Sequence, residues 1–323
     1  MKSLLFCLAV YPALAVAQGT LPQLLGDIPM PGVKGRIDHF GVDAKRHRLF
    51  VAALGNNTVE VLDTGARKRE RSLDGYGEPQ GILHVPETNR VFIANSTANR
   101  VDILDAGSLV LVGHVTGLED ADNVRYDAAA KKVYVGYGRG ALKVLDAATG
   151  AAAGEIALPG HPESFQLEKN GPRIFVNVPI AGRISVVDRA KQAVVASWSV
   201  PAVANFPMAL DEAGRRLFVG TRAPSLLLVY DIDSGRVVAK LPIGGDTDDL
   251  FYSAANKRVY VVCGEGRIDV LRQDDPDHYT SEGSVPTAPR ARTGLLVSED
   301  DTLYVAAPAR GTTPAKVFAF KLK

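Results

Sequence analysis

The sequence predicts an all-β fold built from seven similar units, and three observations support this prediction. The first is a short apolar triplet centred on an aromatic residue, which recurs at steps of 42, 42, 41, 43, 42 and 44 residues. A fixed period in this range marks a repeat architecture in which each repeat is one supersecondary unit. The seven central aromatics are Phe50, Phe92, Tyr134, Phe175, Phe218, Tyr260 and Tyr304.

The second observation is that each unit divides into four strands, as the first unit illustrates. Residues 37–42 form a short apolar-leaning segment, 49–54 a nearly continuous apolar run, 59–62 a third strand, and 67–73 a charged fourth strand. A second strand that is apolar on both faces is expected between neighbouring sheets, and a polar fourth strand at the outer rim. Four strands in such a period make one blade of a β-propeller.

The third observation concerns the two ends of the chain. The seventh unit has three strands, at residues 294–297, 303–307 and 316–322, and no fourth. Near the N-terminus, residues 24–32 resemble the fourth strands of other units. We therefore expect this N-terminal strand to complete the last blade, which closes the ring and removes open sheet edges. The predicted fold is a seven-bladed β-propeller of four-stranded blades.

Aspartate closes the third strand in five units. Two interpretations are open: an array of metal ligands, or turns in which each carboxylate bonds to its own backbone. The residues are dispersed, one per blade near the rim, which favours turn capping. They are Asp63, Asp105, Asp146, Asp188 and Asp231.

The first 17 residues predict a signal peptide. Lys2 supplies a positive start, residues 4–14 are apolar, and residues 15–17 fit the small-x-small pattern that precedes cleavage, here before Gln18. The apolar stretch is too short to span a bilayer. We therefore expect a periplasmic or secreted protein without a membrane span, in which residues 18–323 form a single propeller domain.

Composition limits the classes of partner. The formal net charge is +1, so no overall field favours nucleic acid or an anionic membrane. We expect a monomer that engages a small molecule or a protein partner. Cleavage removes Cys7 and leaves Cys263 alone, which predicts a buried, inert thiol and no intramolecular disulfide.

Two units carry a resemblance to a known family. Phe92-Ile-Ala-Asn95 followed by residues 99–105, and residues 50–53 with residues 57–63, resemble the YVTN-repeat (YncE-like) β-propellers. The resemblance implies a seven-bladed propeller, often exported from bacteria and often without a known activity. The sixth unit departs from the motif, since Arg272 stands where the terminal Asp is expected. No catalytic residue is carried over.

The repeat register identifies the residues expected at the mouth of the central channel, where the loops entering the first strands converge. Twelve residues before the aromatics lie Asp38, Gln80, Asp122, Glu163, Phe206, Asp248 and Arg292. One residue later lie His39, Gly81, Asn123, Ser164, Pro207, Asp249 and Thr293. The His161-Pro162 pair directly precedes Glu163 and can reach the same mouth. The predicted ligand-binding set is Asp38, His39, Gln80, Asp122, Asn123, Glu163, Asp248, Asp249 and Arg292.

Converging carboxylates raise one another's pKa values unless a cation lies among them. Oxygen and imidazole ligands suit a divalent metal ion, for which the candidates are Asp38, His39, Asp122, Glu163 and Asp248. Alternatively, a carboxylate and His39 can act as general acid and base, and Arg292 can receive an anionic group. A third interpretation is a polar, solvated channel without chemistry.

These observations leave three functional hypotheses, and whether the protein is an enzyme stays open. The first is a binding or scaffold protein that engages a small ligand, a metal ion or a protein partner at the mouth. The second is a lactonase-like hydrolase or lyase, by analogy of fold. The third is a periplasmic redox-linked accessory. The sequence lacks a Cys-x-x-Cys-His haem motif, a phosphate-binding P-loop and a Gly-x-Ser-x-Gly motif.

Overall fold

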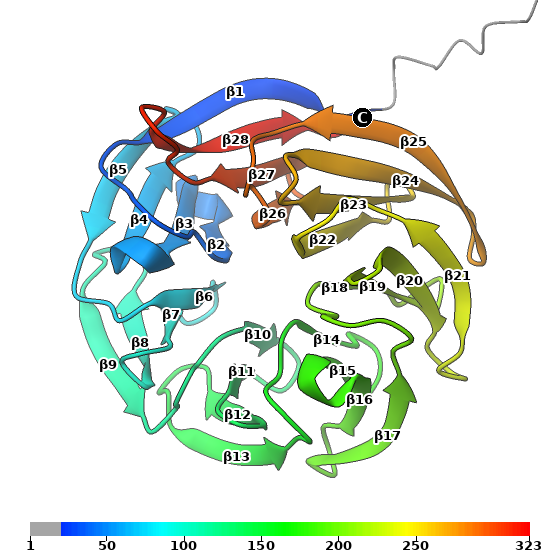
Figure 1. Cartoon of the computed structure of the whole chain (residues 1–323). Helices are drawn as coiled ribbons and strands as arrows, with labels where there is room; N and C mark the ends of the chain where they lie inside the picture. Colours follow the sequence, from blue (N-terminus) through cyan, green and yellow to red (C-terminus); the bar gives the residue numbers. More distant parts are fainter. Residues whose placement is uncertain (1–20) are drawn as a thin grey trace, which may run out of the picture.

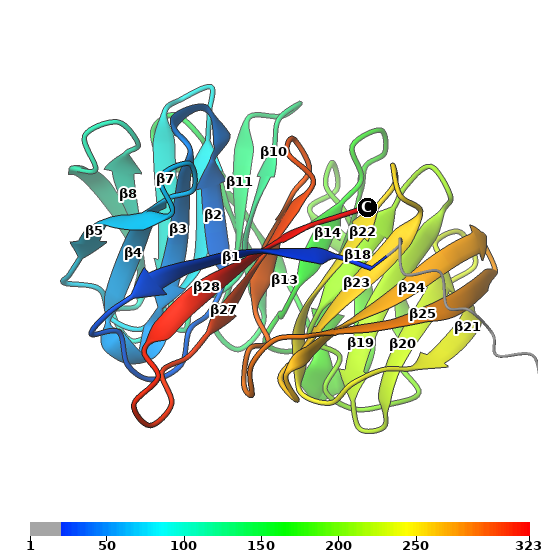
Figure 2. The ribbon, with the colours of Figure 1, turned by 90° about the horizontal axis from the view of Figure 1, so that it is seen from above.

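The computed structural model describes residues 21–323 and shows a closed ring of seven four-stranded antiparallel sheets (Figure 1). The predicted signal peptide and its cleavage site before Gln18 lie outside the described residues. Within residues 21–323, no helix is both long enough and apolar enough to cross a membrane. The side view in Figure 2 shows the strands rising between the two faces of the ring.

The strands occupy four concentric positions in the ring (Figure 1). The innermost strands are β2 (Phe40–Asp43), β6 (Pro79–Val85), β10 (Val124–Asp127), β14 (Phe165–Leu167), β18 (Met208–Asp211), β22 (Thr247–Ser253) and β26 (Gly294–Val297). The second strands are β3 (Arg48–Ala53), β7 (Arg90–Asn95), β11 (Lys132–Tyr137), β15 (Arg173–Val178), β19 (Arg216–Arg222), β23 (Arg258–Cys263) and β27 (Thr302–Ala307).

The third strands are β4 (Thr58–Asp63), β8 (Arg100–Asp105), β12 (Ala141–Asp146), β16 (Arg183–Asp188), β20 (Ser225–Asp231), β24 (Arg267–Asp275) and β28 (Ala315–Lys321). The outer strands are β5 (Lys68–Leu73), β9 (Leu111–Thr116), β13 (Ala152–Ala157), β17 (Ala193–Ser199), β21 (Val237–Pro242), β25 (His278–Pro286) and β1 (Gln23–Met30). Short 3₁₀ turns occur at η1 (Ala44–Arg46), η2 (Leu54–Asn56) and η3 (Pro179–Ala181).

The second strand of each blade is buried on both faces, as the apolar triplets predict. In β3, Leu49 packs in a cluster with Met30 and Val297 of the seventh blade. The neighbouring Phe50 points the other way and packs with Ile82 of the second blade. The recurrent aromatic is therefore core packing between adjacent blades, which is the main source of stability in a stacked-sheet repeat.

The N-terminal strand closes the ring, as predicted. Strand β1 pairs antiparallel with β28, with Asp27 opposite Phe318, and completes the sheet β1-β28-β27-β26. The ammonium of Lys316 lies 2.7 Å from the Asp27 carboxylate across this pair. Met30 is fully buried and packs against blade one as well as blade seven, so this strand bridges both sides of the closure.

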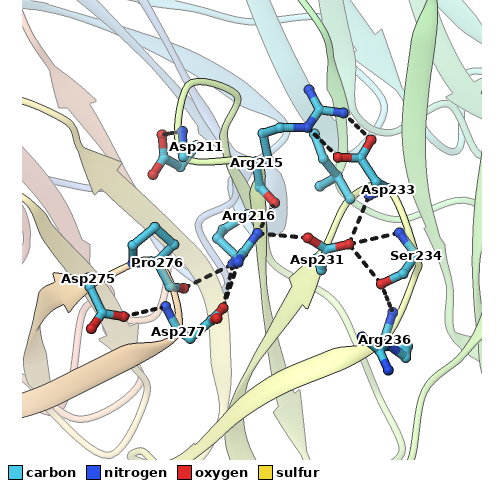
Figure 3. Close-up of polar contacts among 12 residues, drawn as sticks. Asp211, Arg215, Arg216, Asp231, Asp233, Ser234, Arg236, Asp275, Pro276 and Asp277 are labelled. Atoms are coloured by element: carbon cyan, nitrogen blue, oxygen red, sulfur yellow. Dashed lines mark hydrogen bonds and ion pairs between the residues drawn. The ribbon is translucent and has the colours of Figure 1, made fainter.

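The recurrent aspartates are confirmed as turn caps. Asp231 accepts hydrogen bonds from the backbone N–H and the hydroxyl of Ser234, at 2.8 and 2.7 Å (Figure 3). Arg216 links this turn to the neighbouring blade, since it pairs with Asp231 at 2.8 Å and with Asp277 at 2.6 Å. Equivalent backbone bonds, three residues ahead, reach Asp63, Asp105, Asp146 and Asp188.

The sixth blade differs from the sequence interpretation. Its third strand does not end at Arg272 but continues to Asp275, and its fourth strand is equally long. Asp275 then takes the capping role, because its carboxylate accepts from the backbone N–H groups of Asp277 and His278 at 2.8 and 3.0 Å. The sixth blade therefore keeps the aspartate-capped turn, which lies three residues later because the hairpin is longer.

Candidate functional site

In three blades a pair of backbone hydrogen bonds holds the mouth residue just before its inner strand. In the third blade, the N–H of Asp122 donates to the Gly136 carbonyl, and the N–H of Gly136 donates to the Asn123 carbonyl, both at 2.9 Å. The same pair forms at Asp38-His39 and at Glu163-Ser164. Because the geometry repeats, side chains at these register positions converge on one opening.

The residues around this opening form a small polar cavity. Seven of the nine predicted site residues line it, together with Arg36, Ser164 and Phe206. These seven are Asp38, His39, Gln80, Asp122, Asn123, Glu163 and Asp248. Of the other two, Asp249 lies on the channel side of His39 and lines the cavity beneath, and Arg292 pairs with Asp248.

His39 lies at the centre of a group of carboxylates. Its Nδ1 lies 3.4 Å from Asp249 Oδ2, and its Nε2 lies 3.6 Å from Asp38 Oδ1 and 3.9 Å from Asp122 Oδ1. Burial alone lowers the pKa of this ring, but Asp249, Asp38 and Asp122 together raise it to about 10. At neutral pH the ring is therefore held as an imidazolium, which balances part of the charge of the three carboxylates.

Arginines neutralise two of the predicted metal ligands. Asp38 pairs with Arg36 at 2.6 Å. Asp248 pairs with Arg292, at 2.6 Å, and with Arg222. Burial raises the pKa of Asp248 to about 6, although both arginines oppose the shift. Both carboxylates thus have guanidinium partners in bonds that are strong and directional.

The remaining two predicted ligands join a histidine. Asp122, His161 and Glu163 offer ligand atoms that all lie within 4.8 Å of one another, the one such group among residues 21–323. His161 Nδ1 lies 2.7 Å from the Gly138 carbonyl, which can only accept, so Nδ1 carries a proton. Its Nε2 faces Asp122 Oδ2 at 3.8 Å. A backbone carbonyl on the far nitrogen is the usual way in which proteins orient a metal-binding histidine.

Glu163 differs from the other carboxylates because no cationic side chain of the described residues pairs with it. Burial, followed by the charge of Asp122, raises the pKa of Glu163 to about 8. Asp122 is also buried, but His161 and His39 lower its pKa. His161 and His39 also lower the pKa of Glu163, but burial and the charge of Asp122 outweigh them. One carboxyl of this pair is thus held ionised, and its neighbour is largely protonated.

Several residues of the site lie outside the two register positions, so the repeat did not predict them. Arg36 comes from the loop two residues before Asp38, and Arg222 from the end of β19, where its guanidinium stacks over Phe206 at 4.3 Å from the ring centroid. His161 precedes Glu163, and that adjacency was its only sequence signal. Arg36 and His161 lie in loops and Arg222 lies at a strand end, outside the two register positions that the repeat aligns.

Comparisons with known proteins identify the fold. No family model and no curated protein matches the chain. A solved structure of hydrazine synthase from Kuenenia stuttgartiensis is similar, with a TM-score of 0.76 and 15% identity over 92% of this chain and 99% of that one. A chain in the crystal structure of the mitotic checkpoint complex gives a TM-score of 0.79 and 13% identity over 98% of both chains. At these identities the likeness establishes the seven-bladed propeller alone.

Proposed function

We propose that this protein is a binding protein that holds a divalent metal ion at the mouth of its propeller, through Asp122, His161 and Glu163. The proposal is carried by the convergence of two carboxylates and one oriented imidazole within 4.8 Å. Two carboxylates balance the charge of a divalent ion, which displaces the protons that Glu163 and His161 otherwise hold. A mixed nitrogen and oxygen set suits Zn²⁺ or Mn²⁺ better than Ca²⁺, which takes oxygen ligands.

The test is a titration of the chelator-treated protein with Zn²⁺ and with Mn²⁺ by isothermal calorimetry. We expect one ion per chain, and His161→Ala should weaken the affinity by at least about tenfold, since loss of even an outer-shell partner costs that much. Gln80→Ala is the matched control, because Gln80 lines the same mouth outside the metal group. Absence of stoichiometric binding, or equal affinity in the His161→Ala variant, would refute the proposal.

A second candidate function is metal-dependent hydrolysis. It is favoured by one observation: three protein ligands at an open mouth leave a coordination position for water. A bound divalent ion lowers the pKa of such a water and makes it a nucleophile near neutral pH. A panel of lactones and esters, assayed with the metal-loaded protein and with His161→Ala, distinguishes a catalyst from a binder.

Location and family extend the proposal. We infer export to the periplasm or medium from the signal pattern of residues 1–17, and a YVTN-type repeat from the motifs around Phe50 and Phe92. N-terminal sequencing of the protein recovered from an expressing cell tests the first inference, with Gln18 as the expected first residue. The redox-linked role stays a prediction that no observation here favours.

A further inference from the structure

A second cavity lies beneath the mouth, in the channel lined by the innermost strands. Its volume is about 290 Å³, and His39 lies at the boundary because it lines both cavities. Most of the wall is apolar, in contrast to the mouth. The apolar side chains include Phe40, Val42, Ile82, Val124, Phe251 and Leu295. An apolar cavity with few polar groups is the usual form of a small-molecule site.

Arg125, from β10, brings a charge into this cavity. Its guanidinium donates to the carbonyl of Val124 at 2.9 Å, to Asn123 Oδ1 at 3.0 Å and to Ser164 Oγ at 3.4 Å. Across residues 21–323, no carboxylate oxygen lies within 4.0 Å of it. A guanidinium carries five N–H donors, so its Nε–H and one Nη1–H have no partner among the described residues.

The other charged groups of the cavity are already committed. Asp249 Oδ2 accepts from the backbone N–H of Gly294 at 2.9 Å and faces His39 Nδ1 at 3.4 Å. Burial lowers the pKa of His84, which leaves that ring neutral. At the mouth, by contrast, each arginine lies against an aspartate. Burial lowers the pKa of Arg125, and the charges of Asp249 and Asp122 oppose this shift without direct contact. The guanidinium also lies over the ring of Phe165, 5.5 Å from its centroid. Arg125 is therefore a half-buried cation without a direct carboxylate partner, an arrangement that an anionic ligand would stabilise.

We propose that this cavity binds a small carboxylic acid with an apolar body, whose carboxylate bonds to Arg125 and whose body packs against the apolar wall. This site is separate from the proposed metal site. A water molecule occupies about 30 Å³ of the liquid, so the cavity has room for roughly ten water-sized groups, which suits a small acid. A neighbouring cavity of about 430 Å³, between the third and fourth blades, shares Arg125 and Gln166.

The first experiment measures binding of four probes to the wild-type full chain by calorimetry, with a chelator present to exclude binding through a metal. The probes are hexanoate, hexanol, hexylamine and acetate. We expect hexanoate to bind at least about tenfold more tightly than any of the others, because it alone satisfies both the guanidinium and the apolar wall. If hexanol binds as tightly as hexanoate, the charge of the carboxylate does not contribute. If acetate binds as tightly as hexanoate, the apolar wall does not contribute. Either outcome overturns the proposal.

The second experiment assigns the charge to one residue. Arg125→Met keeps the length of the side chain and should weaken hexanoate binding at least about tenfold, while Arg125→Lys should weaken it less, since lysine keeps the charge but loses the planar pair of donors. Arg71→Met, on the exposed outer strand β5, is the matched control and should leave the affinity unchanged. His161→Ala should also retain hexanoate binding, which separates this site from the metal site. Unchanged affinity in Arg125→Met and Arg125→Lys overturns the proposal.

Discussion

Replacing Glu163 with glutamine should stabilise the metal-free protein at alkaline pH and leave its stability almost unchanged at acidic pH. The folded state raises the pKa of Glu163 from 4.5 to about 8. Between these two values the folded protein binds the proton more tightly than the unfolded chain does. The free energy of unfolding of the wild type therefore falls as the pH rises through this window. Glutamine does not ionise, so it removes this loss.

The size of the effect follows from the shift. Each unit of pKa difference corresponds to about 1.4 kcal/mol. At a pH above the folded-state pKa, the full shift would therefore lower the free energy of unfolding by roughly 5 kcal/mol. Glu163 lines a small polar cavity and is not fully buried, which reduces the effective interaction with its neighbours. We expect Glu163→Gln to be more stable than the wild type by about 2 kcal/mol near pH 9, and equal to it near pH 5.

Urea unfolding in the presence of a chelator provides the measurement. Trp198, the single tryptophan of the sequence, packs 5.4 Å from the ring of Phe175 and reports loss of the core through its fluorescence. The control is Glu119→Gln, at an exposed glutamate, which should change the stability by less than about 0.5 kcal/mol at both pH values. A gain of equal size at both pH values, or a loss near pH 9, would show that the account of Glu163 is wrong.

Three further predictions follow from other parts of the structure. Gly81→Ala should weaken Zn²⁺ binding in a calorimetric titration and lower the free energy of unfolding in urea by about 1–3 kcal/mol. The reason is that a Cβ at this position would lie 2.2 Å from the Asp122 carbonyl oxygen. Unchanged affinity and stability would contradict this prediction. Met30→Ala should lower the free energy of unfolding by about 2–5 kcal/mol in the same assay, since this fully buried side chain packs between blades one and seven. The control is Leu25→Ala, at a 40% exposed position of the same strand, which should change the stability little. Cys263 should resist a thiol-specific disulfide reagent in the native state and react after unfolding, because burial raises its pKa to about 12; rapid reaction of the folded protein would contradict this.

The sequence was sufficient to predict the fold because the repeat averages over local ambiguity. A single triplet such as residues 49–51 is compatible with a strand or a buried helix, but seven copies at one period are not. The orphan N-terminal segment was interpretable for the same reason, since only one blade lacked a strand. The aspartate turns were predictable because an Asx turn depends on local backbone geometry alone.

The sequence predicted where the site residues lie, but not which carboxylate pairs with which cationic side chain. The register places Asp38 and Asp122 on the same ring because the backbone bonds at the strand entry repeat. Which carboxylate meets an arginine depends on loops that do not repeat: Arg36 neutralises Asp38, while His161 turns toward Asp122. The sequence therefore indicated five equivalent ligands, and the structure separates a pair with guanidinium partners from the pair that meets an oriented imidazole.

The pairing of β1 with β28 has a consequence for the order of events in the cell. Asp27 and Lys316 are 289 positions apart. Strand β1 is the first described strand to be synthesised, and it cannot pair until β28, the last one, has also been synthesised. Contacts between such distant segments form late, because the entropy of closing the long intervening loop opposes them. The ring therefore cannot close before β28 has been synthesised. The strand that completes the seventh blade thus makes the last step of assembly depend on segments from both ends of the described chain.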